Sequence, residues 1–215
     1  MLRTLWLTAA ILFVFAASAQ IDSVTIVGQI KTKGGYEKLL NRFIESDTTL
    51  TITDFKLIYY GFRYQAAYKP LESEFTENIL KAYNKAGRYP DALAIADTVL
   101  TENPVSLRGY FEKAYTAEQS LDRTTEMYNM KRYIVLCNTI KNSGNGTLES
   151  PYVALSINDA LEFMAYLRLP ALDDRKLENG QIEFDLAKNK QKKIHLYFLI
   201  PDEAYTPPNN PVEDE

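Results

Sequence analysis

The stretch AYNKAGRYPDALAIADTVLTENP, residues 82–104, decides the fold of this chain. Gly87 stands where a helix commonly ends in the left-handed conformation, which glycine adopts without a steric penalty. Pro90 follows at the start of a second helix, where no backbone N–H donor is needed, and Pro104 ends that helix. Ala92 is small enough to let the two helices approach closely. The stretch therefore predicts two antiparallel helices joined by a tight turn.

Five residues of this stretch fall at the offsets that define a tetratricopeptide (TPR) repeat: Tyr83, Gly87, Tyr89, Ala92 and Pro104. The resemblance covers one repeat, residues 73–104, and departs from the motif at Leu80, where a small residue is usual. A repeat of this kind cannot bury its apolar face alone, and about three stacked units are usually needed for stability. We therefore expect residues 36–140 to form helical hairpins that stack on this repeat.

Apolar residues at helical spacing extend this interpretation on both sides. Phe75 and Ile79 are expected to face inward before the turn. Four further residues are expected to line the inner face of a later helix: Met127, Met130, Ile134 and Cys137. Residues 21–30 are instead rich in β-branched side chains and predict a short strand or an extended lead-in. The first helix is therefore expected to begin only after Gly35.

The periodicity changes after residue 141. Three apolar residues alternate with polar ones and predict a strand with one buried face: Ile182, Phe184 and Leu186. Residues 194–200 form a second strand, and the two are expected to pair as an antiparallel hairpin that packs on the helices, with residues 152–157 and 172–177 beside it. Asn158 is expected to cap a short helix. The fold class is therefore α+β, mainly α, with TPR-like antiparallel helical hairpins followed by a small antiparallel β-sheet.

The first residues have the pattern of a secretory signal peptide. Arg3 gives a short basic start, residues 5–17 are apolar and uncharged, and Ala17-Ser18-Ala19 offers a cleavage site. The apolar run is short for a membrane span, and an uncleaved N-terminal anchor is the alternative. We expect an exported protein, periplasmic or extracellular, whose mature chain has no membrane span. Four segments are expected: a signal peptide (1–19), a TPR-like helical body (20–141), an α/β segment packed on that body (142–203) and a disordered acidic tail (204–215).

Composition excludes several classes of function. The chain carries 24 Lys and Arg against 28 Asp and Glu, whereas nucleic-acid binding needs a basic surface. Cys137 is the only cysteine, so we expect no internal disulfide and a buried, inert thiol. His195 is the only histidine, so the count excludes metal sites built from histidine and cysteine. Asp173 and Asp174 are adjacent and would point to opposite faces of a strand. We therefore expect no catalytic residue, no metal and no cofactor.

Aromatic residues are concentrated in the run YYGFRYQAAY, residues 59–68. Tyr60, Tyr64 and Tyr68 are the candidate binding residues, because exposed tyrosines commonly anchor partners. The alternative is a helix interface, since aromatic residues at helical spacing usually belong to a core. Gly61 within this run indicates close backbone packing or a bend.

Five segments, taken in order, carry a wider resemblance: YYGFRYQAAYKP (59–70), AYNKAGRYPDALAIADTVL (82–100), NPVSLRGYFEKAY (103–115), SGNGT (143–147) and IHLYF (194–198). In these segments the chain resembles a family of exported bacterial proteins, the domain of unknown function 4919. The resemblance covers nearly all of the expected mature chain and departs from the family pattern at Asn145 and Leu199. It implies a TPR-like body with a β-rich C-terminal segment, and it implies no activity.

Three functions follow from these observations. The first is a non-enzymatic interaction module that holds a protein or peptide segment in the cell envelope. The second is a small-molecule or glycan-binding protein that uses the tyrosines near residues 59–68. The third is a hydrolase that uses carboxylates or tyrosines. A smooth groove favours the first, exposed tyrosines around a pocket favour the second, and two carboxylates with raised pKa across a cleft favour the third.

Overall fold

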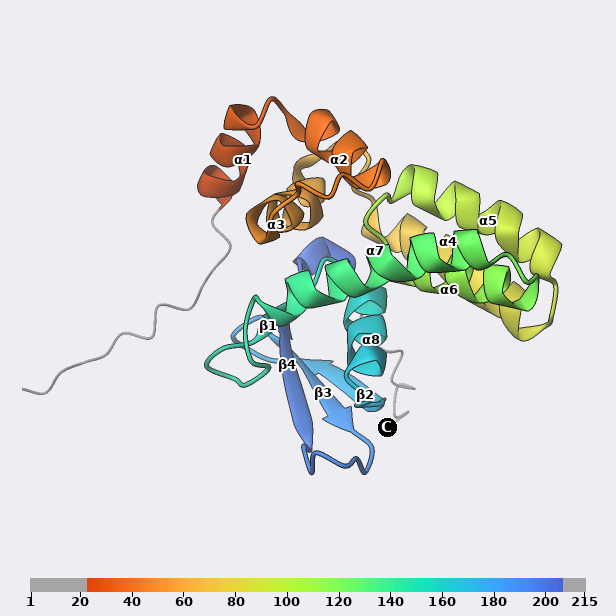
Figure 1. Ribbon diagram of the computed structural model, residues 1–215. Helices are drawn as coiled ribbons and strands as arrows, with labels where there is room; N and C mark the ends of the chain where they lie inside the picture. Colours follow the sequence, from red (N-terminus) through yellow and green to blue (C-terminus); the bar gives the residue numbers. More distant parts are fainter. Residues whose placement is uncertain (1–22, 207–215) are drawn as a thin grey trace, which may run out of the picture.

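The computed structural model describes residues 23–206 (Figure 1). The expected signal peptide at 1–19, and the part of the expected tail from residue 207 onward, lie outside the described residues. The helices are α1 (Ser23–Thr32), α2 (Tyr36–Ile44), α3 (Ile52–Gly61), η1 (Phe62–Tyr64), α4 (Pro70–Lys85), α5 (Tyr89–Glu102), α6 (Leu107–Gln119), α7 (Arg123–Lys141), α8 (Ile157–Tyr166) and η2 (Asp202–Ala204). The strands are β1 (Tyr152–Val153), β2 (Ala171–Lys176), β3 (Ile182–Leu186) and β4 (His195–Leu199). The fold is α+β and mainly α, as predicted.

Helices α4 and α5 form the hairpin that the opening stretch predicted. Gly87 has a φ of 70° in the turn, and Pro90 lies in the first turn of α5. Ala92 and Ala96 are fully buried and pack in one cluster with Leu80 of α4. The position of the turn and the buried place of the small residues are confirmed.

The inward face of α4 differs from the predicted one. Phe75 is exposed and Ile79 is only partly buried, whereas Glu77, Leu80 and Asn84 are buried. Helix α4 packs on both α5 and α6, and the second contact supplies hydrogen-bond partners for the two polar side chains. Polar groups can be buried where such partners exist, so this helix turns a partly polar stripe inward.

Helix α7 also turns a different face to the core. Met127 and Ile134 are exposed, while Cys137 is fully buried as predicted. The buried positions include Arg132 and Tyr133, whose polar atoms reach the backbone of α2 and α8. The buried face of α7 therefore includes two polar side chains with distant hydrogen-bond partners, and it is not the apolar face that the spacing predicted.

Residues 23–32 form helix α1, so the strand expected over 21–30 is wrong. Ile26 and Ile30 lie four residues apart, share one helix face and are buried in the core. Helix α1 packs on α3, where Gly61 leaves room for it. A Cβ at Gly61 would lie 2.6 Å from Ile30 Cδ1. Tertiary packing therefore overrides the β propensity of this segment.

The sheet has the strand order β1-β4-β3-β2. Strands β2, β3 and β4 are antiparallel neighbours, but β1 pairs parallel to β4, so the sheet is mixed and not wholly antiparallel. The strand expected over 152–157 ends at Val153 because the chain turns into α8. Ser156, and not Asn158, caps that helix by accepting a hydrogen bond from the backbone N–H of Asp159.

One hydrophobic core joins the sheet to the helices. Phe184, Leu196 and Phe198 are buried on the face of the sheet that meets Phe163 of α8, as Figure 1 shows for the two elements. Ile194, the first residue of the strand expected over 194–200, is exposed and lies before β4. Ala204 is fully buried, and the expected tail therefore cannot begin at residue 204.

Candidate functional site

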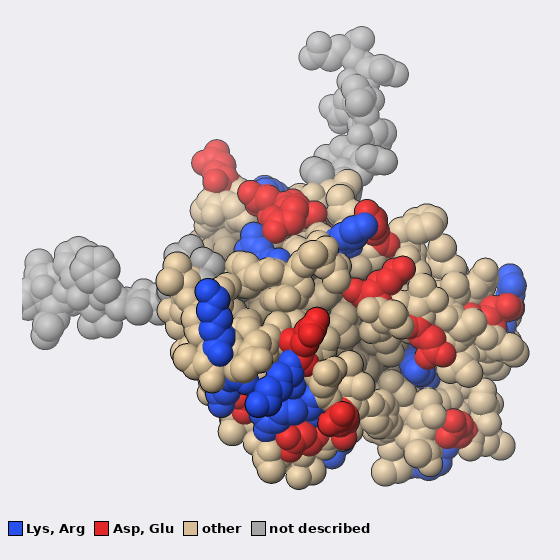
Figure 2. Space-filling view, turned by 90° about the horizontal axis from the view of Figure 1, so that it is seen from above, with Lys and Arg blue, Asp and Glu red and all other residues tan. Residues whose placement is uncertain are grey.

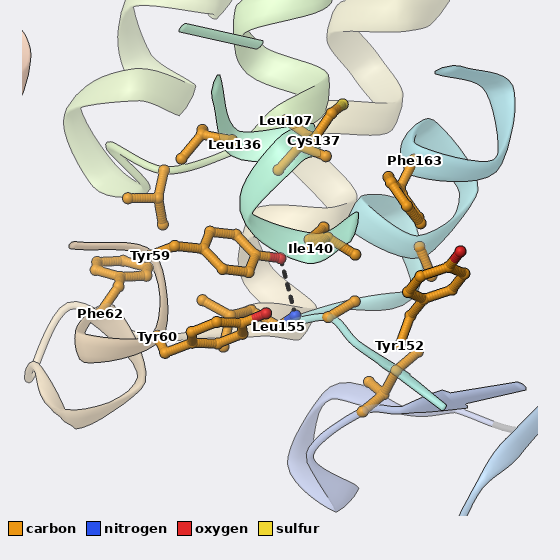
Figure 3. Close-up of a cluster of buried hydrophobic side chains, with 14 of the residues drawn as sticks. Tyr59, Tyr60, Phe62, Leu107, Leu136, Cys137, Ile140, Tyr152, Leu155 and Phe163 are labelled. Carbon is orange, nitrogen blue, oxygen red and sulfur yellow. Dashed lines mark hydrogen bonds between the residues drawn. The ribbon is translucent and has the colours of Figure 1, made fainter. Parts of the chain in front are cut away.

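The tyrosine run lies against the segment that connects β1 to α8. The Tyr59 hydroxyl donates to Asp159 Oδ2 at 2.8 Å and accepts from the backbone N–H of Leu155 at 3.1 Å. The Tyr60 hydroxyl donates to the carbonyl at the end of β1 at 3.2 Å, and the Tyr68 hydroxyl to the Leu155 carbonyl at 2.7 Å. Figure 3 shows Tyr59 and Tyr60 beside Leu155. These hydroxyls therefore satisfy the backbone of a connecting segment inside the core.

The three candidate binding tyrosines differ in accessibility. Tyr60 is only 2% exposed, so the expectation that it presents its ring to a partner is wrong. Tyr68 is half-buried and its hydroxyl is occupied by backbone. Tyr64, which is 38% exposed, lines a cavity of about 190 Å³ between η1 and the β1 and β4 strands. Of the three, Tyr64 alone offers an exposed ring.

The residues that define the predicted repeat contact neighbouring residues of the helical body. Tyr83 is partly buried and lies under the guanidinium of Arg88, 4.3 Å from the ring centroid. Tyr89 meets the edge of Tyr115 on α6. The carbonyl of Pro104 accepts a hydrogen bond from the Tyr110 hydroxyl at 3.0 Å. These contacts join α5 and its flanking turns to α4 and α6.

A groove lies between α7 and the region where α2 leads into α3. One cavity, of about 300 Å³, is lined by Phe43, Leu50, Phe55 and Val135, with Asp47, Lys131 and Arg132 among its polar residues. A second cavity, of about 270 Å³, shares Phe55 and Val135 and adds Ile52. The two cavities adjoin at Phe55 and Val135, and we call the pair the α3–α7 groove.

Arg132 is the charged residue built most deeply into this groove. Its side chain is 3% exposed, and one Nη donates to the carbonyls of Phe43 and Ile44 at the end of α2 and to Ser46 Oγ. The guanidinium lies 3.3 Å from the centroid of the Tyr128 ring. Among the described residues it forms no ion pair with a carboxylate, and its buried Nε–H has no hydrogen-bond partner. Burial lowers the pKa of Arg132 from its ordinary value.

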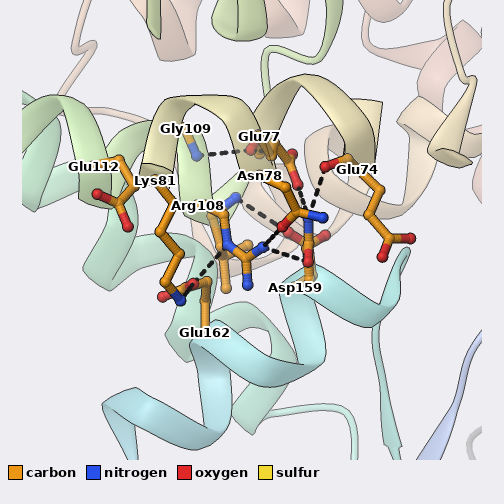
Figure 4. A network of polar contacts seen from close by, with 12 residues as sticks. Glu74, Glu77, Asn78, Lys81, Arg108, Gly109, Glu112, Asp159 and Glu162 are labelled. Atoms are coloured by element: carbon orange, nitrogen blue, oxygen red, sulfur yellow. Dashed lines mark hydrogen bonds and ion pairs between the residues drawn. The ribbon is translucent and has the colours of Figure 1, made fainter. Parts of the chain in front are cut away.

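A second polar cluster joins α4, α6 and α8, and Figure 4 shows it. Arg108 Nε donates to Glu162 Oε1 at 2.7 Å. Glu77 accepts hydrogen bonds from Ser106 and from Asn158. Asp159 accepts one from the backbone N–H of Leu107 at 3.1 Å, in addition to the Tyr59 hydroxyl. Three buried carboxylates thus surround one buried guanidinium.

Burial raises the pKa values of carboxyl groups in this cluster. Desolvation, with the nearby charge of Glu77, raises the pKa of Asp159 to about 7. Burial also raises the pKa of Glu77. Glu77 lies three residues before Leu80 on the inner face of α4, and the apolar periodicity of that helix gave no signal for it. Raised carboxylate pKa values also occur in structural ion networks, and here every named carboxylate oxygen has a protein partner.

The remaining sequence candidates are dispersed. Cys137 is buried, and burial raises the pKa of its thiol, so it is an inert core residue. Asp173 is exposed, whereas Asp174 is half-buried and hydrogen-bonded to Tyr205, so the two carboxyl groups do not face one cleft. His195 Nδ1 lies 2.8 Å from Asp185 Oδ1. Among the described residues, Glu183, Asp185 and His195 could together hold a metal ion.

The surface is mixed in charge. Figure 2 shows Lys and Arg interspersed with Asp and Glu on the face seen from above, and on that face they do not form a basic stripe. Within residues 23–206, every helix is too short or too polar to cross a membrane.

Comparison with known proteins identifies a family. A family model described as "Domain of unknown function (DUF4919)" matches residues 25–204, which is most of the chain. No curated protein and no solved structure matches the chain. The family resemblance noted from the sequence motifs is confirmed.

Proposed function

The chain belongs to the DUF4919 family, and we propose that it is a non-enzymatic interaction module whose α3–α7 groove holds a short segment of a partner protein. The observation that supports this proposal is the groove itself, two adjoining cavities of about 300 and 270 Å³ that share Phe55 and Val135. Ligand pockets of this size commonly have apolar walls and a few polar groups that fix orientation.

The walls of the groove suit large apolar side chains. Phe43, Leu50 and Phe55 line one end, and Ile52 lines the other end with its side chain largely exposed. A partner that buries Ile52 and the half-buried Val135 removes apolar surface from water, which contributes about 25 cal/mol for each Å². Two apolar side chains of a peptide, one in each cavity, would fill both ends of the groove.

The charges of the groove favour an acidic group on that segment. Lys131 is exposed at the groove, and the buried Arg132, which also lines it, has no carboxylate partner among the described residues. Asp47 is already held by Arg42 and by Thr49, which lowers its pKa to about 2. The groove therefore has a surplus of positive charge, and we propose a partner segment with apolar residues next to a carboxylate.

The wider setting of this proposal comes from the sequence. The hairpins α4–α5 and α6–α7, with their resemblance to TPR units, would be the scaffold, and the signal pattern at 1–19 supports a periplasmic or extracellular location in the cell envelope. A glycan or small-molecule site built on Tyr60, Tyr64 and Tyr68 has lost support, because only Tyr64 has an exposed ring. We therefore favour the peptide.

A displayed peptide library, selected on the untagged chain from residue 20, tests the proposal. We expect selected peptides to pair apolar residues with Asp, Glu or a free C-terminus. Ile52→Ser should weaken their binding by about tenfold, which corresponds to roughly 1.4 kcal/mol. Leu172→Ser is the matched control, because Leu172 is 71% exposed and Ile52 is 72% exposed.

Charge reversal tests the second half of the proposal. Lys131→Glu should weaken the same peptides and reduce the dependence of their binding on salt, because an attractive charge is replaced by a repulsive one. Lys85→Glu, on the exposed end of α4, is the control. Selected peptides that bind Ile52→Ser and Lys131→Glu as tightly as the unchanged protein would refute the groove as the binding site.

A further inference from the structure

The outward face of the sheet carries a compact polar cluster. Residues two apart on a strand share a face, and residues directly opposite each other on antiparallel strands also share one. Asp185 pairs with His195, and Glu183 pairs with Tyr197, in the register of β3 and β4. The four side chains therefore project from the face opposite to the one that meets α8.

The distances within this cluster are those of a ligand set. His195 Nδ1 lies 2.8 Å from Asp185 Oδ1 and 3.4 Å from Glu183 Oε1. All three candidate ligand atoms lie within 4.8 Å of one another. Ligand atoms bound at about 2.0–2.2 Å in a tetrahedral zinc site are roughly 3.3–3.6 Å apart. Side-chain adjustments of a few tenths of an ångström to about an ångström would bring these three atoms around one ion.

We propose that Glu183, Asp185 and His195 bind a divalent transition-metal ion of the zinc class. The donor set is one imidazole nitrogen and two carboxylate oxygens. Imidazole suits zinc, iron, nickel and copper, whereas magnesium and calcium prefer sites made wholly of oxygen. The count of histidine and cysteine excluded only sites built from those two residue types, and it did not consider one histidine with carboxylates.

The surroundings of the cluster support this assignment. Glu183 is buried, and the Tyr197 hydroxyl donates to its Oε1 at 2.8 Å, which fixes the orientation of the carboxylate. Such hydrogen bonds to a ligand commonly contribute to metal affinity. In the metal-free protein a proton on His195 Nδ1 can be donated to Asp185 Oδ1. An ion bound at Nδ1 takes the place of that hydrogen bond, and the neutral ring then carries its proton on Nε2.

Arg175 is the competing cation. Its guanidinium contacts Glu183 Oε2 and lies 4.0 Å from Asp185 Oδ2, while His195 faces the other oxygen of each carboxylate. Arg175 therefore need not leave when the ion binds, but its charge repels the ion. Because the Arg175 side chain is 61% exposed, it can be shortened with little effect on the core. Removing the Arg175 charge should therefore raise metal affinity, whereas removing a ligand should lower it.

Titration calorimetry with Zn²⁺ on the untagged chain from residue 20 tests the proposal. We expect one ion per chain, weakened at least about tenfold by His195→Ala, as for loss of a metal contact or its support. Arg175→Ala should bind more tightly than the unchanged protein. Asp91→Asn, which removes an exposed carboxylate on α5, should bind as the unchanged protein does.

A second readout does not depend on a folded variant. His195 is the only histidine, so its ring signals in a nitrogen-15 spectrum of the unchanged protein are unambiguous. Zinc should shift the Nδ1 resonance. Absence of stoichiometric binding, equal affinity of His195→Ala, or an unshifted imidazole would each overturn the proposal.

Discussion

Replacement of Tyr59 by phenylalanine tests how the tyrosine run stabilises the fold. The ring is fully buried, so Tyr59→Phe keeps the packing and removes only the hydroxyl. Two buried groups then lose their partner: the backbone N–H of Leu155 and Oδ2 of Asp159. An unsatisfied buried group costs about 1–3 kcal/mol, so we expect a loss of about 2–4 kcal/mol after partial relaxation.

The control is Tyr60→Phe, which frees the backbone carbonyl of Val153 on a short strand and removes a contact with the partly buried Ser143. We expect it to cost about 1 kcal/mol, the usual net value of one hydrogen bond. For a chain of this length 1 kcal/mol lowers Tm by about 2–4 °C, so Tyr59→Phe should lower Tm by roughly 5–15 °C.

Urea unfolding followed by circular dichroism measures both variants, and an unchanged m value shows that the unfolded states are comparable. A Tyr59→Phe protein within about 0.5 kcal/mol of the unchanged protein, or one more stable than Tyr60→Phe, would refute the argument from unsatisfied groups.

Three further predictions concern the other parts of the fold. The raised pKa of Asp159, about 7, means that its carboxyl group keeps a proton in the folded protein over a pH range in which the unfolded chain has already released it. The contribution of this group to the stability of the folded state is therefore lost as pH rises through 7. Asp159→Asn should therefore flatten the fall in stability between about pH 4 and 8, measured by urea midpoints; an unaltered slope would contradict this. Gly109→Ala places a Cβ 2.8 Å from Val99 Cγ1 and should cost about 1–3 kcal/mol, whereas Gly28→Ala, with nothing within 4 Å, should not destabilise. Deleting residues 182–199 should expose the apolar face of α8 and cause aggregation in light scattering, and a monomeric, folded fragment would show that the sheet is dispensable.

Local signals predicted the parts of the fold that depend on local chemistry. Gly87 and Pro90 marked the helix turn because positive φ and a missing N–H donor each favour one residue type. The alternation of Phe184 and Leu186 marked β3 because these apolar residues share the face of the strand that meets the core. These features could be predicted without knowledge of what lies across the core.

The errors arose where a distant partner decides the outcome. Glu77 and Asn84 are polar, yet they face inward because α6 and α8 supply their hydrogen bonds. Residues 23–32 are helical because Ile26 and Ile30 are buried on one helix face, Ile30 beside Gly61. The sequence around these residues does not indicate which distant residues they contact in the folded protein.

The candidate sites differ in how far the sequence could have predicted them. The α3–α7 groove combines Phe55 with Val135, eighty residues further along the chain, so its walls meet only after folding. Part of the ligand set on the sheet could have been predicted from the sequence. A hairpin centred on Lys190 places Asp185 opposite His195. The register of the predicted hairpin was a usable signal.

The tyrosine hydrogen bonds have a consequence for the order in which the chain folds. Tyr59 and Asp159 are 100 residues apart, and β1 gains its only strand partner from residues near 198. During synthesis, the core around Tyr59 therefore stays open until nearly the whole chain has emerged. Closing so long a loop is slow and entropically costly, while the α4–α5 hairpin forms from neighbouring residues. The hairpin should thus acquire protection from hydrogen exchange first, and α1, α3 and the sheet should acquire it together and last.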